Sequence, residues 1–335
     1  MQVLVTGAAG FIGAALAEAL VTRGDRVTGI DNLNSYYDPK LKHARLERVA
    51  AMAEDAPGSF AFHRLDFADS VSLTVALEEA PFDAIVHLGA QAGVRHSIDN
   101  PASYVHSNLV GHANMLELAR RREIGHFVYA SSSSVYGGNE KLPFSVDDRA
   151  DHPVSLYAAT KRADEMMSEA YAHLYRVPMT GLRFFTVYGP WGRPDMAAWL
   201  FTEAILKGER IRVFNEGEMW RDFTYIDDIV AGVLACIDNP PADDGAPKAG
   251  GSTKAHALYN IGNHRSEKLT RVIELIEDAC GRKAEVELLP MQPGDVARTY
   301  ADIDAIQRDL AYQPTTRIED GIPKVVEGDR AYHGV

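Results

Sequence analysis

Short and long apolar segments alternate along the first half of the chain. Short apolar runs suit buried strands, whereas longer segments with apolar residues every three to four positions suit helices. The pattern predicts strands over 2–6, 26–31, 60–65, 84–88, 126–130 and 178–183, and helices over 11–23, 40–53, 70–79, 101–122 and 155–175. Because parallel strands are joined through helices, it indicates an α/β fold with a Rossmann-type, doubly wound parallel sheet.

The pattern becomes irregular in the second half. One isolated strand is predicted over 210–214, and a helix over 269–280 that Gly281 ends. Residues 239–256 are rich in Pro, Gly and Asp and predict an exposed loop without fixed structure.

We therefore divide the chain into a dinucleotide-binding domain over residues 1–183 and a smaller mixed α/β substrate lobe over 184–335. We expect some segments of the second part to return to the sheet. In open α/β folds, ligands bind at the carboxyl edge of the sheet, where this lobe would lie.

Composition excludes several functional classes. The 335 residues are enough for two domains, and the net charge of −13 is opposite to the basic footprint of a general nucleic-acid binder. The chain begins with Met1 and a predicted strand, and no uncharged apolar run is long enough to span a membrane, so a cytoplasmic location is expected. The two cysteines, Cys236 and Cys280, lie in helical patterns and are too few for a zinc site.

A glycine-rich turn follows the first predicted strand. Gly7, Gly10 and Gly13 are spaced GxxGxxG and lead into the first predicted helix. Glycines allow a tight turn, a close approach of the backbone to a pyrophosphate, and close packing of helix on strand. The helix start, with Phe11 and Ile12, offers free N–H groups to an anion. An ordinary turn can also be rich in glycine. This one becomes a candidate dinucleotide site because it lies between the first predicted strand and a helix, eighteen residues before Asp31.

Asp31 ends the second predicted strand. A carboxylate there accepts hydrogen bonds from the adenosine ribose hydroxyls and repels a 2′-phosphate. Residues 32–35, which begin with Asn32, contain no Arg or Lys, so NAD is favoured over NADP. Asp66, after the third strand, either contacts the adenine amino group or forms an ordinary turn.

Tyr157 and Lys161 form a YxxxK pair within the predicted helix 155–175. The spacing places both side chains on one helix face. A tyrosine has a pKa of about 10 in water, and a neighbouring cation stabilises its phenolate. Tyr157 is thus a candidate general base, and Lys161 also a candidate ligand of the nicotinamide ribose. The pair alone occurs by chance on many helices, but gains meaning together with the glycine turn.

Four serines, Ser131 to Ser134, follow the fifth predicted strand. A hydroxyl here either hydrogen-bonds the reacting oxygen beside Tyr157 or caps local backbone. The sequence has no GxSxG, HExxH or P-loop pattern, and its histidines lack ligand spacing. We therefore expect neither a serine hydrolase nor a metal site.

Together, these features resemble the extended short-chain dehydrogenase/reductase family over nearly the whole chain. Four strings narrow the resemblance to the nucleotide-sugar epimerase/dehydratase branch and, within it, to the UDP-glucuronate 4-epimerases: DNLNSYYD (31–38), HLGAQAGVR (87–95), LRFFTVYGPWGRPDM (182–196) and QPGDV (292–296). The resemblance implies an NAD-dependent isomerase that converts UDP-glucuronate to UDP-galacturonate through a 4-keto intermediate.

The resemblance also implies roles for individual residues. Ser132 would bind the sugar 4-hydroxyl, with Tyr157 as the base and Lys161 beside it. Substrate contacts would come from Thr186, Ser133 and Ser134 at the sugar carboxylate, Arg193 and Arg221 at the diphosphate, and Asp295 at the nucleotide ribose. Arg95 is either a further anion contact or an outward salt-bridging arginine. The implied NAD contacts are Gly7, Gly10, Phe11, Ile12, Gly13, Asp31, Asn32, Asp66, Leu88, Ala90, Asn108, Tyr157 and Lys161.

One departure from the branch bears on the reaction. Dehydratases carry Asp-Glu after the catalytic Thr, and related decarboxylases carry Glu at the last of these positions, where this chain has Ser133 and Ser134. This argues against a dehydratase and less strongly against a decarboxylase. A 4-epimerase of a neutral or N-acetylated UDP-hexose, a UDP-glucuronate decarboxylase and a non-catalytic NAD-binding sensor remain alternatives. The resemblance further implies a homodimer, paired through the helices predicted over 101–122 and 155–175.

Overall fold

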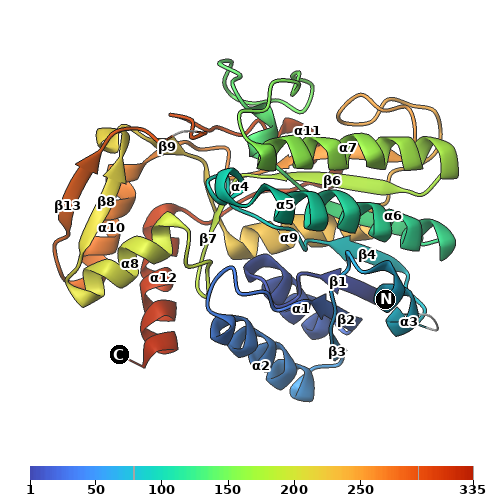
Figure 1. Cartoon of the computed structure of the whole chain (residues 1–335), viewed down its shortest axis with the longest axis horizontal. Helices are drawn as coiled ribbons and strands as arrows, with labels where there is room; N and C mark the ends of the chain where they lie inside the picture. Colours follow the sequence, from blue (N-terminus) through green and yellow to red (C-terminus); the bar gives the residue numbers. More distant parts are fainter. Residues whose placement is uncertain (78–79, 293, 335) are drawn as a thin grey trace.

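The computed structural model describes residues 1–77, 80–292 and 294–334, and a parallel sheet of seven strands forms its centre (Figure 1). The strand order is β11-β6-β5-β4-β1-β2-β3. The strands are β1 (Gln2–Thr6), β2 (Arg26–Asp31), β3 (Ser59–Arg64), β4 (Ala84–His87), β5 (His126–Ser132), β6 (Met179–Phe184) and β11 (His256–Ile261). Their pairings are all parallel, which confirms the predicted doubly wound α/β fold.

Helices cover both faces of this sheet. In β1, Val3 and Val5 pack into one hydrophobic cluster and Leu4 into the other, because successive side chains point to opposite faces. The first face is covered by α1 (Phe11–Arg23), α2 (Pro39–Asp55) and α9 (Ile226–Asp238), and the second by α3 (Ser70–Leu77), α6 (Gly111–Arg121) and α7 (Leu156–Tyr175). Residues 78 and 79, predicted to extend the third helix, lie outside the described residues.

The helix predicted over 101–122 is divided into three segments. These are α5 (Pro101–Tyr104), a π-helical turn η1 (Val105–Val110) and α6, and the short α4 (His96–Asp99) precedes them. The π turn contains Asn108, whose buried amide hydrogen-bonds to the backbone of Gln91 and to Thr160. Such local insertions in a helix often accompany functional sites.

The later part of the chain forms a lobe beside the carboxyl ends of the strands (Figure 1). The strand predicted as isolated, β8 (Arg210–Phe214), pairs in parallel with β13 (Glu285–Leu289), a partner strand that the sequence did not predict. Other elements of this part are β7 (Thr186–Tyr188), α8 (Ala197–Lys207), η3 (Asn215–Gly217), β9 (Trp220–Arg221), β10 (Phe223–Tyr225), β12 (Glu267–Lys268), α10 (Leu269–Cys280), α11 (Asp304–Leu310) and α12 (Ile318–His333). The helix predicted over 269–280 is confirmed, with Gly281 in the left-handed conformation at its end.

Segments from the second half also return to the sheet. β11 extends it beyond β6, and α9 packs against α1. Residues 239–255 contain no helix or strand, although Ala249 and Ala255 are buried. The division at residue 183 stays a proposal.

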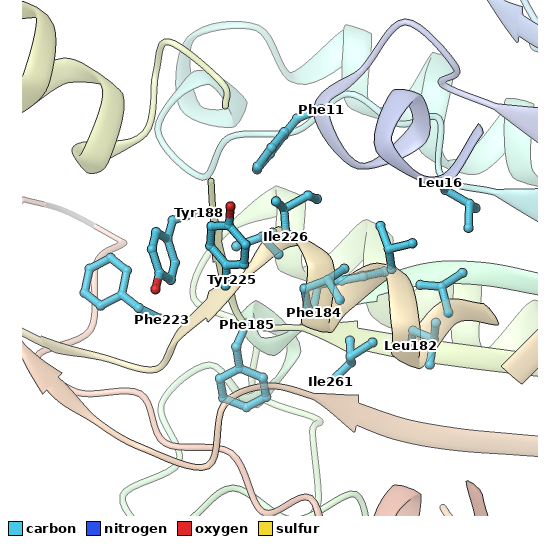
Figure 2. Packing of buried hydrophobic residues seen from close by; sticks show 14 of the residues in the cluster. Phe11, Leu16, Leu182, Phe184, Phe185, Tyr188, Phe223, Tyr225, Ile226 and Ile261 are labelled. Atoms are coloured by element: carbon cyan, nitrogen blue, oxygen red, sulfur yellow. The ribbon is translucent and has the colours of Figure 1, made fainter. Parts of the chain in front are cut away.

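Aromatic and aliphatic side chains join the glycine turn to the lobe. Figure 2 shows Phe11, at the start of α1, above Ile226, and a Cβ on Gly189 would lie 3.5 Å from Cζ of Phe11. Gly189 fits this packing because a Cβ there would lie 2.5 Å from Cγ2 of Ile226. The loop after β7 is thereby held against the first helix.

The described residues hold both cysteines as free thiols and contain no cluster of three potential metal-ligating side chains. None of the helices in that part of the chain is long and apolar enough to cross a bilayer.

Candidate active site

A cavity of about 850 Å³ lies between the carboxyl ends of the strands and the lobe. Its size is within the range of sites for small molecules and cofactors. Its walls bring together most of the residues predicted from the sequence, which are Gly7, Gly10, Phe11, Ile12, Gly13, Asp31, Asn32, Leu88, Ala90, Arg95, Ser132, Ser133, Ser134, Tyr157, Lys161, Thr186, Arg193, Arg221 and Asp295.

The glycine turn has the geometry of a diphosphate cradle. Gly7 has φ +68°, and the N–H of Gly10 donates to its carbonyl at 2.8 Å. A Cβ on Gly13 would lie 2.1 Å from that same carbonyl oxygen, so only glycine fits there. Gly10 precedes α1 without a side-chain cap in the described structure, which leaves the first N–H groups facing the cavity. The turn therefore fits the pyrophosphate of a dinucleotide.

A lysine lies near Asp31 that the residues directly after Asp31 in the sequence did not predict. Its carboxylate accepts the N–H of Leu33 at 2.8 Å, and Nζ of Lys42, from α2, lies 3.7 Å away. Lys42 also donates to Asn34 at 2.9 Å. This end of the cavity is thus less negative than the residues directly after Asp31 suggested, although the Asp31 carboxylate still lines the cavity.

Two predicted cofactor ligands do not line the cavity. Asp66 forms a turn, in which one oxygen accepts the N–H of Ala68 at 2.9 Å and the other faces Asn32 at 3.2 Å. Asn108 is buried, and its amide already bonds to Gln91 and Thr160. It therefore supports the cavity wall from behind, and its contact with a cofactor stays a prediction.

Tyr157 and Lys161 both face the cavity from one side of α7. Ser155 caps this helix by accepting the N–H of Ala158 at 3.1 Å, so the pair sits in its first turns. The Tyr157 ring packs edge-on against Tyr104. Lys161 is almost fully buried and donates to Asp164 at 2.9 Å.

The serines lie at the end of β5, opposite this pair. Ser132 accepts the N–H of Ser134 and donates to its hydroxyl, both at 3.1 Å, as η2 (Ser133–Tyr136) begins. Thr186, at the start of β7, lines the same cavity. Ser131 instead points inward and donates to Glu165 at 2.6 Å. Four neutral hydroxyl groups, three from the serines and one from Thr186, thus line this wall.

Arg193 is held by a carboxylate and a tyrosine. Asp195 accepts from its Nε at 3.0 Å and its Nη2 at 2.5 Å, and Tyr36 donates to the same carboxylate at 3.0 Å. Tyr36 comes from the loop after β2, so this cluster links the cofactor side to the lobe. Burial and the Asp195 carboxylate raise the pKa of Tyr36 to about 12.

A second arginine cluster lies at the lobe side of the cavity. Arg221 and Arg95 each approach a different oxygen of Asp295 at 3.4 Å. Arg95 also lies over the Phe214 ring at 4.9 Å, with its side chain 54% exposed. Both predicted roles of Arg95 therefore fit its position, because it is salt-bridged and faces the cavity.

Arg45, like Lys42, is a functional candidate that the sequence did not indicate. It is 1% exposed, and its guanidinium donates to the carbonyls of Ala9, Trp191 and Gly192 and to the hydroxyl of Tyr37. One side chain of α2 thereby ties the glycine turn to the loop that presents Arg193. It lies in a charged stretch that reads as a solvent-facing helix, so no local signal marked it.

A model of the NAD dependent epimerase/dehydratase family matches residues 3–262. The chain belongs to this family. The predicted resemblance is therefore confirmed, and so is the dinucleotide-binding fold that the glycine turn indicated.

Relatives within the family narrow the comparison. The chain is 46% identical to the probable UDP-glucuronate 4-epimerase of Rhizobium meliloti (strain 1021), over 98% of this chain and 96% of that one. It is 45% identical to UDP-glucuronate 4-epimerase 3 of Arabidopsis thaliana, over 99% of this chain and 77% of that one.

A solved structure of the same kind superposes over the full length. The crystal structure of UDP-glucuronic acid 4-epimerase from Bacillus cereus, in complex with UDP-glucuronic acid and NAD, matches with a TM-score of 0.85 and 30% identity over 99% of this chain and 100% of that one. The UDP-glucose 4-epimerase of Thermotoga maritima, with UDP-glucose, matches with a TM-score of 0.86 and 28% identity over the same shares.

Proposed function

We propose that this protein is an NAD-dependent isomerase that inverts C4 of UDP-glucuronate to give UDP-galacturonate. The observation that carries the proposal is that Tyr157, Lys161, a wall of hydroxyl groups and two arginine clusters line one cavity with the glycine turn. Relatives named for this reaction cover nearly the whole chain at about 45% identity.

NAD would lie along the glycine turn, with Asp31 at its adenosine ribose and Lys161 at its nicotinamide ribose. The chemistry that bound NAD supplies is reversible hydride transfer at C4 of the sugar. Tyr157 takes the proton of the 4-hydroxyl, which Ser132 helps to orient, as a 4-keto sugar forms. After the sugar has turned over, Tyr157 returns the proton to the oxygen on the opposite face.

The proposed substrate contacts use the charges of the lobe. Arg193 and Arg221 would bind the diphosphate, because a guanidinium fork matches phosphate oxygens. Arg95 and Asp295 would act beside them, with Asp295 at the nucleotide ribose.

The sugar carboxylate sets a second requirement. A 4-keto uronate is a β-keto acid and tends to lose CO2 when the bond to its carboxylate aligns with the ketone. Hydroxyl groups of Ser133, Ser134 and Thr186 would fix that carboxylate away from alignment.

We also propose a homodimer formed through α7 and the segment 101–121. Both present apolar side chains to solvent, with Met166 62% and Leu174 64% exposed on α7 and Val105 44% and Val110 45% exposed on the other. Burying such a face is what a two-fold interface does. The cytoplasmic location stays a prediction.

The test is to incubate the purified protein with UDP-glucuronate without added reductant and to follow sugar nucleotides and CO2 by proton NMR and headspace analysis. A mixture with UDP-galacturonate and no CO2 supports the proposal. A UDP-pentose with CO2 would identify a decarboxylase, and turnover of UDP-glucose alone would identify a neutral-sugar epimerase. The variant Tyr157→Phe should lose turnover and keep bound NAD, and retained turnover would remove Tyr157 from the mechanism.

A further inference from the structure

The ammonium group of Lys161 has a fixed anionic partner behind the cavity wall. Nζ of Lys161 lies 2.9 Å from Oδ2 of Asp164, and the two side chains are 3% and 0% exposed. Lys161 lines the cavity and Asp164 does not. The carboxylate therefore reaches the site only through the lysine.

The other titratable groups around this pair are neutral or already paired, so Lys161 and Asp164 carry the charges that matter here. Glu165, next on α7, is occupied by Arg183 and Arg162. His112 from α6 and His87 from β4 both face Lys161, and burial lowers the pKa of each, so both are neutral. Tyr129 from β5 faces Asp164, and burial raises the pKa of its hydroxyl, so it is neutral too.

The buried carboxylate of Asp164 is only partly hydrogen-bonded. Its Oδ1 is buried without a hydrogen-bond partner in the described structure, whereas its Oδ2 takes the lysine. A buried carboxylate with only one oxygen hydrogen-bonded lowers stability, so a structural role alone does not account for Asp164. Burial raises the pKa of Asp164 to about 6, despite the opposing effect of Lys161.

We propose that Asp164 is a positioning residue that acts as the counterion of Lys161 and thereby sets the pH range in which Tyr157 and Lys161 work. The inference rests on the roles proposed above for those two residues. A negative charge behind the lysine offsets part of the positive field that Lys161 exerts on Tyr157, and it favours the charged form of the ammonium group. It therefore moves both ends of the working range upward.

The variant Asp164→Asn keeps the shape of the side chain and removes its charge. We expect both limbs of the pH profile of kcat/KM for UDP-glucuronate to move to lower pH. The alkaline limb should move by about one pH unit or more, because the removed charge lies 2.9 Å from Nζ of Lys161, and the acid limb should move less. Below about pH 6 the two profiles should converge, because the wild-type carboxyl is then protonated as well. The matched control is Glu169→Gln, the same chemical change on the same helix, at a half-exposed side chain that contacts His256.

A merely structural role would lower kcat and leave both limbs where they are, and this result would overturn the inference. Movement of the limbs in Glu169→Gln as well would also overturn it, because the effect would then not be specific to the pair.

A stability measurement tests the same pair without catalysis. In the Lys161→Met background, Asp164→Asn should raise the free energy of unfolding, because it removes an unpaired buried carboxylate. If Asp164→Asn does not fold alone, the double variant should still fold, since both charges are gone. A loss of stability on adding Asp164→Asn to Lys161→Met would overturn the inference. This readout holds even if the protein does not turn over UDP-glucuronate, so the two proposals fail separately.

Discussion

Replacing Arg45 with Met should weaken both the fold and the binding of the UDP-sugar. The wild-type guanidinium lies 2.7 Å from the hydroxyl of Tyr37 and from the carbonyls of Trp191 and Gly192, and 3.2 Å from that of Ala9. Methionine fills a similar volume but offers no donor, so the buried carbonyl oxygens of Ala9 and Gly192 and the part-buried one of Trp191 lose their partner.

The expected cost follows from these contacts. An unsatisfied buried polar group costs about 1–3 kcal/mol. A small neighbouring cavity lined by Arg45 and Trp191 can admit water, which favours the low end of that range. Arg45 also has no salt bridge to a carboxylate in the described structure, and burial lowers its pKa, so removing the cation returns part of the loss. We therefore expect a fall in the free energy of unfolding of about 2 kcal/mol, which is three losses at the low end less the part returned.

The effect on binding follows from the loop that Arg45 holds. The carbonyls of Trp191 and Gly192 directly precede Arg193, so a loosened loop should raise KM for UDP-glucuronate several-fold and change kcat less. Arg45→Lys should restore only part of both, because an ammonium group cannot span four acceptors as a planar fork does.

The assays are urea unfolding and steady-state kinetics, with Arg48→Met as the matched control. Arg48 is on the same helix and lies over the Trp191 ring at 4.6 Å, but its side chain is 39% exposed. Its loss should cost less than about 1 kcal/mol. An Arg45→Met protein with wild-type stability and KM would refute the role of Arg45 in holding the loop that precedes Arg193.

Three further outcomes are expected. Gly13→Ala should lower NAD affinity at least tenfold, about 1.4 kcal/mol or more, because its Cβ would lie 2.1 Å from the carbonyl oxygen of Gly7; Gly138→Ala, whose Cβ meets nothing closer than 4.0 Å, is the control for equilibrium dialysis. Burial lowers the pKa of His87 to about 3 and that of His126 to about 4. The unfolded chain therefore binds more protons below pH 6.5, and stability should fall as the pH is lowered below that value. Urea unfolding should show His126→Gln reducing this slope by up to about 1.4 kcal/mol per pH unit, and an unchanged slope would contradict the assignment. Met166→Asp should convert the proposed dimer to a monomer in sedimentation, and an intact dimer would place the interface elsewhere.

The fold was predictable where local pattern and burial coincide. The predicted bounds of the first helix and second strand match α1 and β2, because a two-sided buried sheet imposes a regular apolar pattern on both. The π turn at 105–110 left no mark, since its apolar spacing remains helical over short stretches. The pairing of β8 with β13 was also hidden, because nothing local in two strands some seventy residues apart identifies them as partners.

The site divides in the same way. The glycines and the YxxxK pair are marked by local spacing, so their place in one cavity was predictable, whereas their roles stay predictions. Arg45 and Lys42 depend on contacts made after folding, because each looks like an exposed residue of a polar helix until the loop after β7 or the end of β2 covers it. The sequence names residue types, but only the fold decides which of many charged side chains are buried.

The balance of charge in the cavity bears on what distinguishes substrates. The acidic protein places two arginine clusters on the walls of the cavity, Arg193 held by Asp195 and the pair Arg221 and Arg95 held by Asp295. A diphosphate brings about two negative charges and can take over these partners at little cost in rearrangement. The sugar carboxylate would then face the neutral hydroxyls of the β5 and β7 ends rather than a cation.

Binding energy should therefore come mainly from the diphosphate that all UDP-sugars share, whereas orientation at C4 depends on the hydroxyls. It follows that a neutral UDP-hexose should compete for binding with modest loss, and that selectivity for the uronate should appear in kcat and in the suppression of CO2 release.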